Sequence, residues 1–301
     1  MIGRQPECAR TLAECLPDAV CGVQPCVLFT ALTVQFFFDG IRKGSLQPNG
    51  PVYTPRMARN EEAPGPIVFV GGHMSWPVGY RRLTRILADV SGSEVHVVPI
   101  TPFDWVLGEL RGYGQLVFEV ASTVDRALLE SASKKAVLVG YSAGGILARA
   151  YIGGESPYGG RRYSGHRRIS HLITLGTAHN VPNERTLAPI TEINELFPGA
   201  LHPSIRYLCV AGDAIDGASS GRTRRRYERF VGDGRVGGDG KVPLPSALLP
   251  GAESLVLDGV YHGRLLGGAV GHWYGSDREI VERWWPEELR VEERLVEKPH
   301  A

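Results

Sequence analysis

From residue 66 onward, two patterns of apolar and polar positions alternate along the chain. Short continuous apolar runs predict buried strands, and longer stretches with apolar residues three and four positions apart predict helices. The runs expected as strands are 67–70, 94–100, 136–140, 171–176, 205–212 and 254–257. The stretches expected as helices are 80–90, 116–131, 145–151 and the charged amphipathic region 276–297.

Strands that alternate with helices predict crossover connections, and therefore a mostly parallel sheet. The strand runs are apolar throughout, which is typical of strands covered by helices on both faces. The predicted fold class is therefore α/β, with a mostly parallel central sheet and helices on both faces. In open sheets of this kind, sites form beyond the carboxyl ends of the strands, so we expect the chemistry there.

The first sixty residues do not follow this alternation, and we treat 1–60 as an N-terminal extension before one domain at 61–301. Residues 19–38 are apolar and long enough to cross a bilayer. However, Gln24, Pro25 and Gln35 interrupt them, and Asp18 stands where a signal peptide would carry positive charge. The extension is either a leader or packed helix followed by a linker at 44–66, or a targeting or anchoring segment. The second interpretation would allow a plastid or membrane-associated location, and the compartment stays open.

The charge balance gives no global reason to expect a nucleic acid or an anionic membrane as partner. The 301 residues include 33 Lys and Arg against 32 Asp and Glu. Two arginine-rich stretches, 161–168 and 222–229, lie among Gly, Ser and Tyr residues. We interpret both as solvated loops, with a site for an anionic head group as the alternative. The second stretch belongs to a predicted insertion at 214–236.

Five cysteines are present, and no C-x-x-C pair occurs among them. A zinc site or a redox-active pair is therefore not expected, and the sequence predicts neither a metal nor an organic cofactor. Cys209 stands in a predicted strand, where a small buried hydrophobic residue is the simplest interpretation.

The segment VLVGYSAGGILARAYI, residues 137–152, contains the pattern G-x-S-x-G between a predicted strand and a predicted helix. A serine on such a sharp turn needs small neighbours, because side chains two positions away on either side would collide. Gly140 and Gly144 remove those collisions. Ser142 is therefore expected to project its hydroxyl at the end of the strand, near the partial positive charge of the helix N-terminus. An ordinary tight turn is the alternative interpretation.

The sequence VLVGYSAGG resembles the nucleophile elbow of serine esterases and lipases of the α/β-hydrolase family. The resemblance implies that fold, with Ser142 as nucleophile and an acid and then a histidine following it along the chain. It also implies that the histidine lies in a loop after the last strand. His262, in SLVLDGVYHG, fits that place as general base, and His272, in GHWYG, is the alternative.

The acid has two candidate positions. The segment GDGKVPLPSALL is similar to a Gly-Asp-Gly-x-Val-Pro segment of a lipase-like branch that includes bacterial, cyanobacterial and plant members and resembles GPI inositol-deacylases. The resemblance implies that Asp239 is the triad acid. Asp213, or Asp216 beside it, follows the predicted strand 205–212 directly and is the alternative.

The same family resemblance implies an oxyanion hole built from two backbone N–H groups. We assign one to Ala143, after the nucleophile, and the other to His73, in the loop FVGGHMSW. The segment ITLGTAHN resembles a Leu-Gly-Thr-Pro-His segment of these lipases, with Ala178 in place of the proline. Residues 177–203 would then be a lid, or alternatively a helix with a core face, whose apolar residues are Leu187, Ile190, Ile193, Leu196 and Phe197.

Together these residues predict a carboxylic ester hydrolase that acts through an acyl-enzyme on a small-molecule or lipid ester, with lipid acyl esters favoured. No nucleic-acid partner is expected, and peripheral membrane contact is compatible with this interpretation. A thioesterase or an acyltransferase would use the same residues. A non-catalytic binding protein of the same fold is the alternative from another class, although such proteins usually lack a triad member. The apolar candidates for contact with an acyl chain are Met74, Trp76, Tyr80 and Tyr141.

Overall fold

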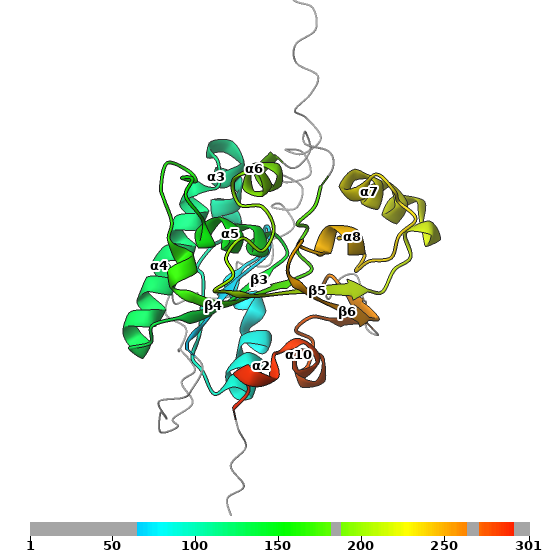
Figure 1. Cartoon of the computed structure of the whole chain (residues 1–301). Coiled ribbons are helices and arrows are strands. Elements are labelled where there is room, and N and C mark those ends of the chain that lie inside the picture. Colours follow the sequence, from blue (N-terminus) through cyan, green and yellow to red (C-terminus); the bar gives the residue numbers. More distant parts are fainter. Residues whose placement is uncertain (1–64, 182–187, 264–270, 292–301) are drawn as a thin grey trace, which may run out of the picture. The chain divides into compact units, whose positions relative to one another are not determined.

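The computed structural model describes residues 65–181, 188–263 and 271–291 (Figure 1). The extension 1–60, the apolar segment 19–38 and four of the five cysteines lie outside these residues. Six strands form one sheet in the order β2-β1-β3-β4-β5-β6, and every neighbouring pair is parallel. The strands are β1 (Ile67–Val70), β2 (Val95–Val97), β3 (Ala136–Tyr141), β4 (Ile169–Leu175), β5 (Arg206–Asp213) and β6 (Glu253–Asp258).

Helices connect the strands and follow the last of them. They are α2 (Arg81–Ser91), α3 (Pro102–Arg111), α4 (Gly114–Ser131), α5 (Ala143–Ile152), α6 (Ala188–Leu196), α7 (Gly221–Val231), α8 (Leu244–Ala247) and α10 (Arg278–Trp284). Shorter 3-10 turns are η1 (Pro77–Tyr80), η2 (Gly165–Arg167), η3 (Gly217–Ser219) and η4 (Glu287–Leu289). Two short strands, β7 (Val260–Tyr261) and β8 (His272–Trp273), pair with each other outside the main sheet.

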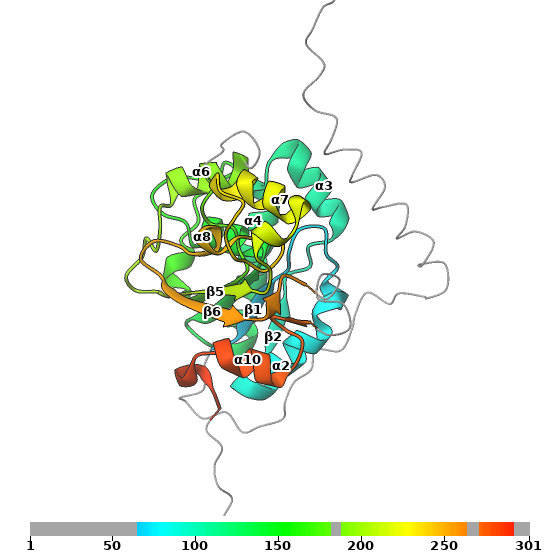
Figure 2. The same ribbon diagram turned by 90° about the vertical axis from the view of Figure 1, so that its right-hand side faces the viewer.

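Alternating side chains of the central strands enter two separate apolar cores. Val68 and Leu138 belong to the core that includes α4 and α5. Phe69 and Val139 belong to the core that includes α2 and α10. Figures 1 and 2 show these two helix pairs on opposite faces of the sheet. The prediction of a parallel α/β sheet covered on both faces is therefore confirmed.

Helix α7 shows that the interpretation of residues 222–229 as a solvated loop is wrong. The Ser220 side chain accepts the N–H of Thr223 at the start of this helix, and Gly232 ends it with φ +77°. Tyr227, on the inner face, is completely buried. Burial of this face stabilises the helix, while most of the arginines remain exposed on its outer face.

Two other helices differ from the prediction. Helix α3 was not expected, although a capping box between Thr101 and Asp104, with Pro102 at the first helical position, marks its start. The helix expected at 276–297 is shorter, because α10 ends at Trp284 and Pro286 follows it. Residues 292–297 lie outside the described residues. None of the described helices is long and apolar enough to cross a lipid bilayer.

Candidate active site

Ser142 lies in the sharp turn between β3 and α5, at the carboxyl end of a central strand. Its φ of +53° and ψ of −127° are unfavourable for a residue that carries a Cβ, at a cost of about 1–3 kcal/mol. The Ser142 N–H donates to the Leu175 carbonyl at 2.9 Å, and the Thr177 hydroxyl donates to the Ser142 carbonyl at 2.8 Å. The end of neighbouring β4 and the residues directly after it therefore hold the serine in this strained conformation.

Two glycines provide the space that this turn requires. A methyl group on Gly144 would lie 2.3 Å from the carbonyl oxygen of Val70. One on Gly140 would lie 2.5 Å from the Cα of Gly145. In both places the obstacle is backbone and cannot move aside, so the start of α5 approaches β1 and β3 closely only without these side chains.

His262 connects Ser142 to a buried carboxylate. Its Nε2 lies 2.9 Å from Ser142 Oγ, and its Nδ1 lies 2.7 Å from Asp239 Oδ2. An ionised carboxylate can only accept, so Nδ1 carries the proton and Nε2 is free to accept from the serine hydroxyl. The structure thus brings together the three residues that the sequence selected, in an order that directs a proton away from Ser142.

Asp239 is only 1% exposed, yet it has a hydrogen-bond donor for each of its acceptor sites. Oδ1 accepts the N–H groups of Lys241 and Val242 at 2.9 and 2.7 Å. Oδ2 accepts from His262 and from the Tyr274 hydroxyl, the latter at 2.9 Å. These charge-assisted bonds offset the loss of water around the buried charge. Sequence reasoning missed the part played by Tyr274, because nothing local links it to residue 239.

The alternative acids lie elsewhere. Asp213 ends β5 and faces Gly237, where an added methyl group would lie 2.5 Å from its Oδ1. Asp216 caps η3 by accepting the Ala218 N–H at 2.8 Å. Asp239, the preferred candidate, is the carboxylate beside His262.

Helix α7 reaches the Asp239 loop through its inner face. The Tyr227 hydroxyl accepts the N–H of Gly240 at 2.8 Å, and Arg226 Nη1 donates to the Gly240 carbonyl at 2.6 Å. The N–H and the carbonyl of Gly240, the residue after Asp239, are therefore both hydrogen-bonded to α7. Helix α7, in the arginine-rich insertion, therefore helps to hold the loop that carries Asp239.

The loop after β1 passes directly beside Ser142. A methyl group on Gly72 would lie 3.1 Å from Ser142 Cβ, and the next residue is His73. The His73 imidazole bonds α3, because its Nε2 lies 2.7 Å from Glu109 Oε1. Ala143 is the first residue of α5, where N–H groups lack intrahelical acceptors. The backbone N–H groups of His73 and Ala143 remain the predicted oxyanion donors.

Two of the four residues expected to contact an acyl chain are bonded within the protein. The Tyr80 hydroxyl donates to Ser75 Oγ at 2.8 Å and accepts the Gly72 N–H at 2.9 Å, which fixes the loop after β1. The Tyr141 hydroxyl donates to the His262 carbonyl, and the two rings pack 5.3 Å apart. Of the four candidates, Met74 and Trp76 are partly exposed, and neither side chain has such a bond to the described residues.

Other sequence-selected residues are also placed by the structure. His272 is exposed and lies 3.0 Å from Asp277 Oδ2, so it does not join the site. In the segment 177–203, the apolar residues of α6 and its C-terminal end face the core, with Ile193 completely buried, which agrees with the core-face interpretation. Leu187 lies outside the described residues. Cys209 is buried, as expected. Within the described ranges, no cluster of three His, Cys, Asp or Glu side chains is placed to hold a metal ion.

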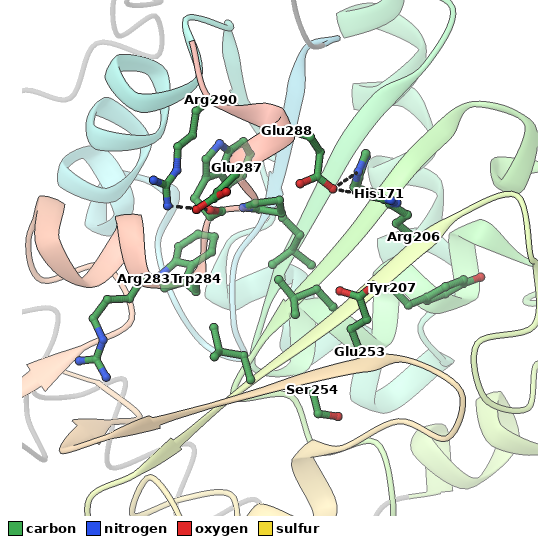
Figure 3. A pocket seen from close by; sticks show the side chains of 15 residues that line it. His171, Arg206, Tyr207, Glu253, Ser254, Arg283, Trp284, Glu287, Glu288 and Arg290 are labelled. Carbon is green, nitrogen blue, oxygen red and sulfur yellow. Dashed lines mark hydrogen bonds and ion pairs between the residues drawn. The ribbon is translucent and has the colours of Figure 1, made fainter. Parts of the chain in front are cut away.

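A separate pocket of about 410 Å³ lies at the opposite end of the sheet, between the starts of β4, β5 and β6 and the segment from α10 to η4 (Figure 3). None of the site residues selected from the sequence lines it. Glu288 forms an ion pair there with Arg206 and lies 3.6 Å from His171 Nε2, as the dashed lines in Figure 3 show. Ser254, the serine that lines the pocket, bonds no histidine among the described residues, while His171 lies 3.0 Å from the Oγ of the adjacent Ser170.

Comparison with known proteins identifies the fold. No family model and no curated protein matches the chain. A lipase of Bacillus licheniformis in its mature form is similar in structure, with 19% identity and a TM-score of 0.50, over 71% of this chain and 92% of that one. The same lipase in its propeptide form matches with 18% identity and a TM-score of 0.45, over 75% of this chain and 50% of that one. An esterase of Pyrobaculum calidifontis matches with 16% identity and a TM-score of 0.31, over 54% and 60%.

The likeness to the mature lipase, together with the parallel sheet, shows that the chain has the α/β-hydrolase fold. At this level of identity it shows the fold alone, because one fold supports many reactions.

Proposed function

We propose that the protein is a serine hydrolase that cleaves carboxylic esters, with lipid acyl esters favoured, through an acyl-enzyme intermediate. One observation carries the proposal: Ser142 Oγ, His262 and buried Asp239 form a continuous hydrogen-bonded chain with spacings of 2.9 and 2.7 Å. The serine of this chain sits on a strained turn at the carboxyl end of the sheet. A histidine oriented by a carboxylate is the arrangement that activates a hydroxyl for attack on a carbonyl carbon.

The reaction follows from these positions. Ser142 Oγ forms a bond to the ester carbonyl carbon while His262 Nε2 takes the serine proton. The tetrahedral intermediate collapses, the bond to the alcohol oxygen breaks, and His262 returns the proton to the leaving alcohol. Water then attacks the acyl-enzyme, again losing a proton to His262, and the carboxylic acid leaves as Ser142 recovers its hydrogen. Asp239 stabilises the imidazolium form of His262 in both halves of the reaction.

Negative charge develops on the carbonyl oxygen in each tetrahedral intermediate. We assign its stabilisation to the N–H groups of Ala143 and His73. The closeness of Gly72 to Ser142 and the position of Ala143 at the start of α5 support this assignment. Removing one such donor in other acyl-transfer enzymes costs about 100- to 1,000-fold in rate, so the loop after β1 is expected to be indispensable.

An apolar surface beside this loop supports a lipid substrate. Phe103, Leu107 and Leu110 lie on one face of α3, spaced four and three positions apart, and are 55%, 46% and 74% exposed. Helix α3 contacts the loop after β1 through the bond between Glu109 and His73. Exposed apolar patches of this kind mark surfaces that meet other apolar material. We propose that acyl chains, or the surface of a lipid aggregate, contact α3.

The lipase-like branch that resembles GPI inositol-deacylases is part of this proposal. Its support is the loop around Asp239, which has the Gly-Asp-Gly-x-Val-Pro sequence and carries the carboxylate bonded to His262.

A fluorophosphonate probe, which reacts with activated serines, tests the central assignment. We expect intact wild-type protein to be labelled and the Ser142→Ala variant to remain unlabelled. Failure of folded wild-type protein to react would contradict the hydrolase assignment. Labelling that persists in Ser142→Ala would instead show that another residue is the nucleophile.

The lipid preference has its own test. Leu110→Asp is expected to lower activity on emulsified long-chain esters several-fold, with little change on a soluble short-chain ester. Leu129→Asp is the matched control, because Leu129 is also highly exposed, at 83% against 74% for Leu110, but lies at the far end of α4. Equal losses in the two variants, or no loss in either, would argue against a role for α3 in lipid contact.

A further inference from the structure

Tyr274 is a completely buried tyrosine whose hydroxyl lies between Asp239 and the main chain of β5. Its oxygen is 2.9 Å from Asp239 Oδ2 and 2.8 Å from the N–H of Gly212. The reaction proposed above gives this residue no part. It lies in HWYGS, a segment whose histidine faces solvent and bonds Asp277 instead of joining the site.

The two contacts fix the direction of the hydroxyl hydrogen. A backbone N–H can only donate, so the Tyr274 oxygen accepts from Gly212. A phenol has a single hydrogen, and it must therefore be donated to the carboxylate. Burial and the nearby charge of Asp239 raise the pKa of Tyr274 well above 10, so the hydroxyl keeps this hydrogen throughout the neutral range.

The surroundings leave room for this pair and hold it in place. A methyl group on Gly176 would lie 2.7 Å from Asp239 Oδ2 and 2.8 Å from the Tyr274 oxygen. One on Gly212 would lie 3.0 Å from the same tyrosine oxygen. From the other side, Trp284 on α10 donates its indole N–H to the Tyr274 carbonyl at 2.8 Å. Residues far apart in the sequence thus surround this tyrosine: Gly176 and Gly212 approach its hydroxyl, and Trp284 bonds its carbonyl.

We propose that Tyr274 is a positioning residue for the triad, which sets the orientation and the basicity of Asp239 by donating to the same oxygen that holds His262. The inference rests on the proposed function of Ser142, His262 and Asp239. A carboxylate oxygen that accepts from two donors is fixed in its plane, and its charge is shared between them. Tyr274 therefore moderates how strongly Asp239 stabilises the imidazolium form of His262.

Removing this donor has a predictable sign. Without the Tyr274 hydroxyl, the negative charge on Asp239 Oδ2 acts on His262 alone and favours the protonated imidazole. A higher pH is then needed before His262 can accept the serine proton. The carboxylate also loses one of the contacts that hold its plane. We expect Tyr274→Phe to lower the rate of reaction of Ser142 about tenfold, which is the order of magnitude for loss of one hydrogen bond to a charged group. We also expect the acidic limb of its pH profile to move upward by about half a pH unit.

Other titratable groups around Asp239 are unchanged in this variant, so the shift reports the loss of the Tyr274 hydroxyl. They are Tyr141 from β3, Asp213 from β5, Tyr227 and Arg226 from α7, and Lys241 from the carboxylate's own loop.

The experiment is the rate of fluorophosphonate labelling of the full-length chain as a function of pH, which requires no knowledge of the natural substrate. Tyr151→Phe is the matched control, because the Tyr151 hydroxyl is also buried but has no hydrogen-bond partner among the residues that the structure describes. It should label as wild type does. Site-specific 3-fluorotyrosine at position 274 is a stronger donor of nearly the same size, and should move the acidic limb to lower pH. This substitution also carries the test if Tyr274→Phe does not fold.

A wild-type rate and pH profile for folded Tyr274→Phe would overturn the proposal, as would shifts in the same direction for phenylalanine and fluorotyrosine. Absence of labelling in the wild type would contradict the proposed function itself, and is therefore a different result.

Discussion

The two ends of the parallel sheet carry similar side chains in different arrangements. At the carboxyl end, Ser142, His262 and Asp239 are linked in one directed chain, and the histidine and the carboxylate are both buried. At the amino end, the pocket of Figure 3 also contains a serine, a histidine and a carboxylate.

In the amino-end pocket, Ser254 is exposed and bonds no histidine within the described residues, while Glu288 pairs with Arg206 at the surface. The same residue types are therefore arranged differently, because the carboxyl end combines a strained serine with a buried histidine and a buried carboxylate. The following predictions test that contrast, beginning with the largest expected effect.

Substitution of Asp239, the carboxylate bonded to His262, is expected to have the largest effect on activity. Asp239→Asn should lower kcat/KM on a short-chain ester by about four orders of magnitude, because an amide cannot hold the required tautomer of His262 or stabilise its cation. Asp213→Asn and Glu288→Gln are controls from the end of β5 and from the amino-end pocket, and each should retain activity within about twofold. A larger loss in Asp213→Asn than in Asp239→Asn would reassign the acid.

The close packing behind the serine is expected to have the next largest effect. Gly144→Ala places a methyl group 2.3 Å from a backbone oxygen, so we expect the free energy of unfolding to fall by about 3 kcal/mol or more. Gly221→Ala, at the open start of α7, meets nothing within 4 Å and should be neutral or slightly stabilising. Urea unfolding of both variants measures the difference, and a Gly144→Ala variant as stable as wild type would refute it.

Two histidines, His171 near the start of β4 and His179 beyond its end, are expected to affect the pH dependence of stability differently. Burial, and then Arg149, hold the pKa of His179 well below 6.5, so it stays neutral in the folded protein. In the unfolded chain it titrates near 6.5. Below that pH the unfolded state binds a proton that the folded state does not, and stability falls by up to about 1.4 kcal/mol per pH unit.

We therefore expect His179→Gln to flatten the fall in stability between about pH 6.5 and 5. Burial also lowers the pKa of His171 at the amino end, but Glu288 opposes that effect, so His171→Gln should flatten it less. Thermal unfolding across this range measures both slopes. An unchanged slope in His179→Gln would show that another group causes the acid sensitivity.

The smallest effect is expected from the ion pair at the amino end. Arg206 and Glu288 have side chains that are 66% and 45% exposed, so solvent screens their attraction. Arg206→Ala should change the free energy of unfolding by less than about 1 kcal/mol and leave ester hydrolysis unaffected. A large loss of activity in this variant would show that the two ends of the sheet are coupled.

Several features could be predicted from local patterns. The strands at 67–70 and 254–257 lie within the observed β1 and β6, and the predicted helix 116–131 lies within α4. The edge strand β2 is shorter than expected, with Val95–Val97 in place of 94–100. Helix α7 was missed because its outer face is almost entirely arginine, and only packing against the Asp239 loop shows that Tyr227 belongs inside. Local signals existed for α3 and α7, since capping residues precede both.

The sequence by itself determined the strand–turn–helix context of Ser142, the glycines around it, and the order of serine, acid and histidine. The first two are local properties, because steric limits at a sharp turn act on neighbouring residues, and the order of the three residues is that of the linear chain. Only the tertiary structure decided which aspartate lies against His262, that Tyr141 and Tyr80 support backbone groups, and that Tyr274 bonds Asp239. Those contacts join residues up to 121 positions apart, and the order in which strands pair in the sheet brings them together.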